Sequence, residues 1–175
     1  MNSVVNKIDG SFQQLVLSNK VNLFDLIRGV LEQIGRADIS ISTFANSEDF
    51  LRVLFKLKNR GLIGHATLIN DIMFTKKTLK MSKLLQNVYD KVYFVDNHSK
   101  CTLIENEKHR IGILSTQNQT RIKRFECHLI SNDEKFFSDL KAGFEQMRTK
   151  ARKANDILTR HTERNRGNGD QSDQD

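Results

Sequence analysis

The spacing of hydrophobic residues changes partway along this chain, and that change limits its folds more than any other feature. Residues 22–34 and 46–60 carry apolar side chains at helical spacing, and they alternate with β-forming runs at 38–44 and 62–69. After an expected helix at 75–90, polar turns join a series of short β-forming runs, at 92–95, 100–104, 110–114 and 124–130. This order predicts an α/β protein with a mixed β-sheet flanked by helices.

A long helix is expected after the last of these strands. Ser131 followed by Glu134 has the pattern of a capping box, and apolar positions at helical spacing continue from there to Leu158. Residues 162–175 have no apolar anchor and predict a disordered polar tail. We therefore expect three parts. Residues 1–36 form an N-terminal segment and helix packed on the principal domain, which spans residues 37–161, and residues 162–175 form the tail.

The charge of the chain limits its partners. Its 175 residues include 28 Lys and Arg against 21 Asp and Glu, giving a formal net charge of +7. This excess favours a polyanion such as nucleic acid, although a solvated surface would carry the same side chains. No apolar run approaches the roughly 18 residues of a membrane span, and residues 1–10 have no secretory pattern. We expect a cytoplasmic protein with no membrane partner.

The segment around His98 carries the side chains best suited to chemistry on phosphate. On a strand, His98, Lys100 and Thr102 would lie on one face, because side chains alternate along a strand. A lysine supplies fixed positive charge, and a neighbouring imidazole can attack phosphorus or transfer a proton near neutral pH. By itself the pair could also be an ordinary exposed strand face.

Two later segments strengthen the functional interpretation. Residues 115–118, Ser-Thr-Gln-Asn, follow an expected strand and supply hydroxyl and amide donors for an anion. Glu126 begins the next strand, and a carboxylate there can orient an imidazole. Successive neighbouring strands can bring these groups together at one end of the sheet. The other candidates are given structural roles: His65 as a buried or edge residue, His109 in a hairpin, and Cys101 and Cys127 in the core.

Taken in order, these motifs resemble the phospholipase D superfamily. His98, Lys100 and Glu105 have the spacing of its HxKx4D signature, with Glu in place of Asp. Residues 115–118 resemble its GSxN element, with Ser115 in place of Gly, and Arg124-Phe125-Glu126 resembles its later acidic position. The resemblance implies a phospholipase D-like mixed sheet with a long C-terminal helix over residues 37–161.

The resemblance also implies a role for each site residue. His98 would be the nucleophile that accepts the phosphoryl group as a phosphohistidine. Lys100 and Asn118 would hold the non-bridging oxygens of the phosphate, and Ser115 and Thr116 would help to bind the substrate. In this chemistry neither a metal nor another cofactor is required.

Other residues would support that site. Glu126 would hydrogen-bond the imidazole of His98 and set its tautomer, and Glu105 would support the fold around it. His128 shares a strand face with Glu126 and is a further supporting candidate. The family mechanism uses a second histidine as the acid for the leaving group. This chain has one copy of the motif, so the resemblance implies a homodimer in which each protomer supplies one His98.

Three functions therefore stay open at this point. The first is a metal-independent phosphodiesterase, a nuclease that cleaves DNA or RNA. The alternative is a catalytically weak or inactive module that binds nucleic acid, which the departures at Glu105 and Ser115 favour. The third is a phosphodiesterase that acts on lipid. The absence of an apolar membrane-directed segment favours nucleic acid over lipid.

Overall fold

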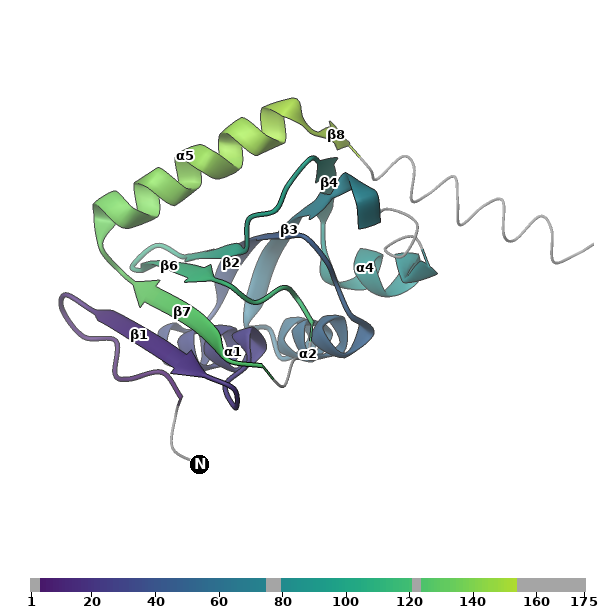
Figure 1. Ribbon diagram of the computed structural model, residues 1–175. Coiled ribbons are helices and arrows are strands. Elements are labelled where there is room, and N and C mark those ends of the chain that lie inside the picture. The colour runs from purple at the N-terminus through teal and green to yellow at the C-terminus, as the bar shows by residue number, and fades with distance from the viewer. Residues whose placement is uncertain (1–3, 75–79, 121–123, 154–175) are drawn as a thin grey trace, which may run out of the picture.

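The computed structural model describes residues 4–74, 80–120 and 124–153. They form an eight-stranded sheet in the order β1-β7-β6-β5-β2-β3-β4-β8, with α1, α2 and α4 on one face and α5 across the other (Figure 1). The helices are α1 (Leu23–Ile34), α2 (Glu48–Asn59), the 3-10 turn η1 (Ile72–Phe74), α4 (Ser82–Val88) and α5 (Glu134–Lys150). The strands are β1 (Gln13–Ser18), β2 (Ala37–Thr43), β3 (Ile63–Asp71), β4 (Lys91–Val95), β5 (Cys101–Glu105), β6 (Arg110–Ser115), β7 (Glu126–Ser131) and β8 (Arg152–Lys153).

The sheet is mixed, as the sequence predicts. β2, β3 and β4 are parallel neighbours, because α2 and the segment containing α4 return the chain to the same end between them. β2–β5, β5–β6, β6–β7 and β7–β1 are antiparallel pairs. As a result, the ends of β2 and β6 and the beginnings of β5 and β7 lie at one end of the sheet.

Local sequence explains the two helices beneath the sheet. Asn22 and Asp25 form the capping box that starts α1, and Ser47 accepts a hydrogen bond from the backbone of Phe50 at the start of α2. The apolar side of each helix packs against the sheet, with Leu26 and Leu54 fully buried there. Both helices begin at the end of the sheet where β2 finishes.

The structure corrects the expected start and end of the C-terminal helix. Asp133, not Ser131, caps α5, because its carboxylate accepts a 2.7 Å hydrogen bond from the backbone of Phe136. Ser131 stays in the sheet, where it pairs with Gln13 and with β6. The helix stops at Lys150 and the chain then pairs with β4, so the expected continuous helix to Leu158 is wrong. Residues 154–175, including the expected polar tail, lie outside the described residues.

The N-terminal segment contains a strand that the sequence did not predict. β1 pairs with β7 along its whole length, from Gln13–Ser131 to Ser18–Glu126. Its apolar run is only three residues long, Leu15 to Leu17, so strand pairing and not periodicity identifies it. The segment before α1 is therefore part of the same sheet.

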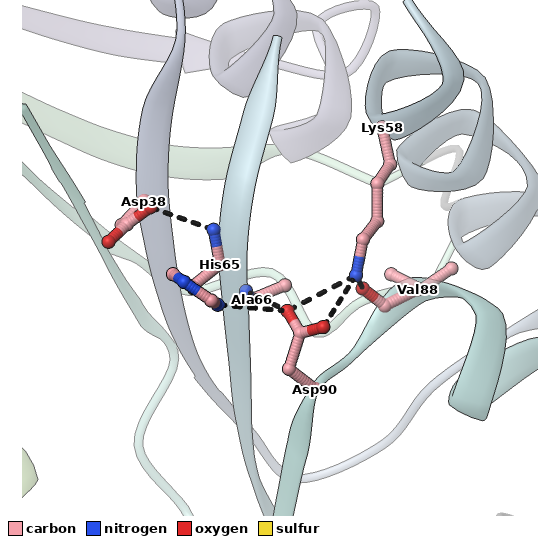
Figure 2. A network of polar contacts seen from close by, with 6 residues as sticks. All are labelled: Asp38, Lys58, His65, Ala66, Val88 and Asp90. Atoms are coloured by element: carbon pink, nitrogen blue, oxygen red, sulfur yellow. Dashed lines mark hydrogen bonds and ion pairs between the residues drawn. The ribbon is translucent and has the colours of Figure 1, made fainter. Parts of the chain in front are cut away.

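At the opposite end of the sheet from β5's beginning, Asp90 joins β3, β4 and α2. Its carboxylate accepts a 2.8 Å hydrogen bond from the backbone of Ala66 and lies 3.1 Å from Nζ of Lys58 (Figure 2). The exposed ring of His65 lies 3.9 Å from the same carboxylate, and Asp38 accepts the backbone N–H of His65 at 2.7 Å. His65 is thus exposed and lies on a strand between β2 and β4, not in the buried or edge position that the sequence predicts. No helix in the described ranges is long and apolar enough to cross a membrane.

Candidate active site

The predicted site residues other than Glu105 gather at the end of the sheet where β5 and β7 begin. His98 and Lys100 immediately precede β5, Thr116 and Asn118 immediately follow β6, and Glu126 is the first residue of β7. Lys100 does not belong to a strand, contrary to the expected strand at 100–104, because β5 begins one residue later. The antiparallel pairing of β5, β6 and β7 nevertheless brings these chain segments together.

His98 and Lys100 contact each other directly. Nζ of Lys100 lies 3.2 Å from Nδ1 of His98 and donates a 2.7 Å hydrogen bond to the His98 carbonyl oxygen. An ammonium group can only donate, so Nδ1 is the accepting nitrogen and a neutral His98 carries its proton on Nε2. The exposed ring of His98 keeps its remaining edge open to solvent.

Phe44, in the loop between β2 and α2, forms one wall of this site. Its ring centroid lies 4.8 Å from that of His98 with the two planes tilted by 57°. The ammonium of Lys100 lies 5.8 Å from the same ring centroid, within reach of a cation–π interaction. Nothing in the local sequence identifies Phe44, which is distant from His98 along the chain.

Glu126 contributes negative charge to the site, but it does not contact His98. Its carboxylate accepts a hydrogen bond from the hydroxyl of Thr116. Burial lowers the pKa of Lys100, and the charge of Glu126 opposes that shift. Burial likewise lowers the pKa of His128, again opposed by Glu126. Glu126 therefore lies close enough to stabilise a cation here, while the expected hydrogen bond to the imidazole is not formed in this structure.

The segment after β6 presents its side chains alternately inward and outward. Gln117 and Gln119 are buried, whereas Thr116 is exposed and Asn118 half-buried. The buried residues anchor the segment to both helix starts: Oε1 of Gln117 accepts the Leu23 N–H at 2.8 Å, and the carbonyl of Gln119 accepts the Ser47 N–H at 2.8 Å. Rigid anchoring of this kind holds the two outward side chains at the site.

Asn118 remains free to bind something else. Its side chain makes no hydrogen bond to any residue that the structure describes, and its buried Oδ1 has no partner there. Buried amide groups are normally paired, so an unpaired one at this position calls for a bound group or water. The unpaired Oδ1 can only accept a hydrogen bond, so it calls for a donor such as water, whereas Nδ2 is the atom that could donate to a phosphate oxygen.

Ser115 and His128 form a buried support behind the site. Oγ of Ser115 lies 2.9 Å from Nδ1 of the fully buried His128, and the Ser115 N–H donates a 2.8 Å hydrogen bond to the Lys100 carbonyl. His128 thus supports Lys100 through Ser115. Because Ser115 is occupied in this way, its hydroxyl does not face the outward side chains with which the sequence grouped it.

Glu105 lies apart from the other candidates. It is the last residue of β5, at the far end from Lys100, and its carboxylate forms a 2.7 Å ion pair with Lys141 of α5. Glu105 thus ties the sheet to α5. Within the ranges that the structure covers, no three His, Cys, Asp or Glu side chains are placed to hold a metal ion.

No family model and no curated protein matches this chain. Solved structures do match. Nuc from Salmonella typhimurium, a phospholipase D family member, has a TM-score of 0.65 at 13% identity over 82% of this chain and 98% of its own. NucT from Helicobacter pylori has a TM-score of 0.62 at 14% identity over 81% of this chain and 98% of its own.

A third similar structure is TrmBL2, an archaeal chromatin protein that binds DNA. It has a TM-score of 0.54 at 14% identity, and the match covers 81% of this chain and 53% of TrmBL2. Two of these structures match almost from end to end, and the order of strands and helices around His98 is that expected from the motifs. The chain has the fold of the phospholipase D superfamily.

Proposed function

We propose that this protein is a metal-independent phosphodiesterase that cleaves DNA or RNA. The observation that carries the proposal is the contact between Lys100 Nζ and His98 Nδ1, at 3.2 Å, in a phospholipase D fold. Thr116, Asn118 and Glu126 lie at the same end of the sheet. A cation, an uncommitted amide and an imidazole are the groups needed to bind and attack a phosphodiester.

The reaction proceeds in two displacements. The ammonium of Lys100 turns from His98 to the non-bridging oxygens of the bound phosphodiester, which Asn118 also binds. Nδ1 of His98, the nitrogen without a proton, attacks phosphorus, and the bond from phosphorus to the leaving oxygen breaks. His98 of the partner subunit protonates that oxygen. Water then attacks the phosphohistidine, gives its proton to the same partner histidine, and releases His98. Glu126 accepts the imidazole N–H once Lys100 has moved, because its charge favours the cationic ring.

An exposed apolar surface supports the homodimer. Leu15, Leu17, Leu114 and Phe125 are 68%, 70%, 45% and 71% exposed. Leu15 pairs with Leu129, which also pairs with Leu114 across β7, so Leu15 and Leu114 lie on one face of the sheet. Leu17 shares that face because side chains alternate along β1, and Phe125 directly precedes β7. We call this set the β1–β7 patch. Apolar patches of this kind mark protein–protein contacts.

The position of the β1–β7 patch fits a shared site. It lies on the α5 side of the sheet beyond the helix, which covers Gly112 through Phe136 but leaves Leu114 exposed. Phe125, the residue before Glu126, lies at the end of the patch where β7 begins. A second copy seated on this patch would therefore lie beside the candidate site and could supply the second histidine.

The competing function is a module that binds nucleic acid without cutting it. Part of the DNA-binding chromatin protein TrmBL2, 53% of its length, is similar in structure to this chain, which favours this candidate independently of the motifs. The net charge of +7 suits both functions equally. Cleavage is therefore the property that separates them.

The test is cleavage of single-stranded and double-stranded DNA and of RNA in excess EDTA. Wild-type protein is compared with His98→Ala and with His109→Ala, a matched control in the hairpin between β5 and β6. We expect the wild type and His109→Ala to cut, and His98→Ala to cut no faster than background. Equal cutting by His98→Ala would refute the assignment of the nucleophile. Salt-sensitive binding without cutting by the wild type would instead establish the binding module.

The homodimer has its own test. Analytical ultracentrifugation compares the wild type with Leu17→Lys in the β1–β7 patch and with Met73→Lys, which changes another exposed apolar residue away from the patch. We expect the wild type and Met73→Lys to be dimers and Leu17→Lys to dissociate, because a buried lysine without a partner is costly. A dimer that survives Leu17→Lys would place the interface elsewhere.

A further inference from the structure

The segment that carries His98 is fixed by a buried asparagine that the proposed chemistry does not use. Asn97 is buried, although the next side chain, His98, is exposed. Nδ2 of Asn97 donates to Oγ of Ser42 at 2.9 Å and to the carbonyl of Thr43 at 3.3 Å. Its Oδ1 accepts two hydrogen bonds from Ser99, from the backbone N–H at 2.9 Å and from Oγ at 2.6 Å. One amide thus ties the end of β2 to both sides of His98.

The backbone of Asn97 is attached to a second strand. Its N–H donates a 2.9 Å hydrogen bond to Oδ2 of Asp71, the last residue of β3. Oδ1 of the same buried carboxylate accepts the Met73 N–H at 2.7 Å, so Asp71 is itself held by the turn after β3. Asn97 is therefore fixed between the ends of two adjacent parallel strands.

This anchoring determines where the reactive pair lies. Ser99, held by Asn97, separates His98 from Lys100, and the ammonium of Lys100 returns to the His98 carbonyl at 2.7 Å. The ring of His98 lies 4.8 Å from that of Phe44, whose loop directly follows the Thr43 carbonyl that Asn97 binds. A displacement of Asn97 would therefore move His98 relative to both of its neighbours.

We propose that Asn97 is the positioning residue of the site: its amide sets the place of the His98 imidazole against Lys100 and Phe44. The inference rests on the proposed phosphodiesterase function and adds a residue to it. Displacing a reacting group by about 1 Å can slow a reaction about 100-fold. Alanine at position 97 removes all five side-chain hydrogen bonds, to Ser42, Thr43, Ser99 and the carbonyl of Ile69, while the backbone bond to Asp71 remains.

Asn106 offers a matched control at the other end of β5. Its Oδ1 accepts the backbone N–H groups of Lys108 and His109 at 3.0 and 2.8 Å. Its Nδ2 donates to the carbonyls of Ile34 and Arg36 at 3.1 and 3.2 Å. Asn106→Ala therefore removes a similar set of hydrogen bonds from a loop that lies far from His98.

The experiment compares wild type, Asn97→Ala and Asn106→Ala in two measurements. The first is cleavage of nucleic acid in EDTA, for which we expect Asn97→Ala to lower kcat about 100-fold and to change KM far less. Asn106→Ala should keep the wild-type kcat. The second is the NMR spectrum of the His98 ring, whose carbon-bound protons are shifted by the adjacent Phe44 ring. Those shifts should move toward free-histidine values in Asn97→Ala only.

The two measurements separate the failure of this inference from the failure of the proposed function. If the wild type does not cleave, the proposed function fails, and the NMR shifts still decide whether Asn97 sets the His98 ring. Unchanged His98 shifts in Asn97→Ala, or a kcat as high as that of Asn106→Ala, would overturn the inference. Asn97→Asp keeps the acceptor for Ser99 but loses the donor to Ser42, so an intermediate kcat is expected for it.

Discussion

Removing the charge of Asp90 should destabilise the protein by about 1–2 kcal/mol. Its carboxylate accepts the Ala66 N–H at 2.8 Å, and hydrogen bonds to charged groups contribute about 1.5–3 kcal/mol. Asp90→Asn keeps a neutral acceptor of roughly half that strength, a loss of about 1 kcal/mol. The ion pair with Lys58 adds about 0–1 kcal/mol, because the two side chains are 41% and 23% exposed and solvent screens them.

The same carboxylate should make this difference depend on pH. Burial alone would raise the pKa of Asp90, but the hydrogen bond from Ala66, together with the hydrogen bond and charge of Lys58, lowers it overall. A lowered pKa in the folded state means that the carboxylate stabilises the protein fully above its unfolded pKa of about 3.9. That contribution is lost as the pH falls through the folded pKa. The difference between wild type and Asp90→Asn should therefore be constant near neutral pH and shrink at acid pH.

Urea denaturation at one fixed protein concentration measures this difference at several pH values. The matched control is Asp139→Asn, which removes an exposed ion pair with Lys135 on α5 and should leave the free energy of unfolding unchanged. If Asp90→Asn is as stable as wild type near pH 7, the network in Figure 2 does not stabilise the fold. If Asp90→Asn lowers the free energy of unfolding by the same amount at acid and neutral pH, the carboxylate charge is not the cause of the destabilisation.

Two further predictions concern the site and the packing of α5. Glu126→Gln should lower the pKa of Lys100 further, because burial then acts without the opposing negative charge. NMR titration of Lys100 measures this pKa, and an unchanged or higher value would contradict the proximity of the two groups. Gly112→Ala should destabilise the protein by about 1–2 kcal/mol, because the added Cβ would lie 2.8 Å from Cε1 of Phe136. Thermal unfolding tests this, and the same substitution in a Phe136→Ala background should cost less if the clash is its cause.

Much of the fold could be predicted because its signals are local. The capping residues Asn22 and Ser47 and the apolar faces behind them identify α1 and α2. β1 could not be predicted in this way, because its stability comes from pairing with β7 more than 100 residues later.

The site residues likewise differ in whether local sequence or strand pairing determines their position. His98 and Lys100 are two residues apart, so the sequence alone places their side chains near each other. Glu105 fits the signature equally well by spacing, yet β5 carries it to the other end of the sheet, where it pairs with Lys141. Spacing along a strand fixes the distance between two residues, but it does not predict at which end of the sheet the candidate site lies.

By itself, the sequence determined the class of fold, the order of the central elements and the residues proposed to bind phosphate, since each depends on neighbours along the chain. Only the tertiary structure decided what surrounds them: Phe44 beside His98, Thr116 on Glu126, and Asn97 fixed by Asp71. These contacts join residues 10 to 54 positions apart in the sequence. Their geometry exists only once the strands have paired, because the pairing of the sheet sets which loop ends meet.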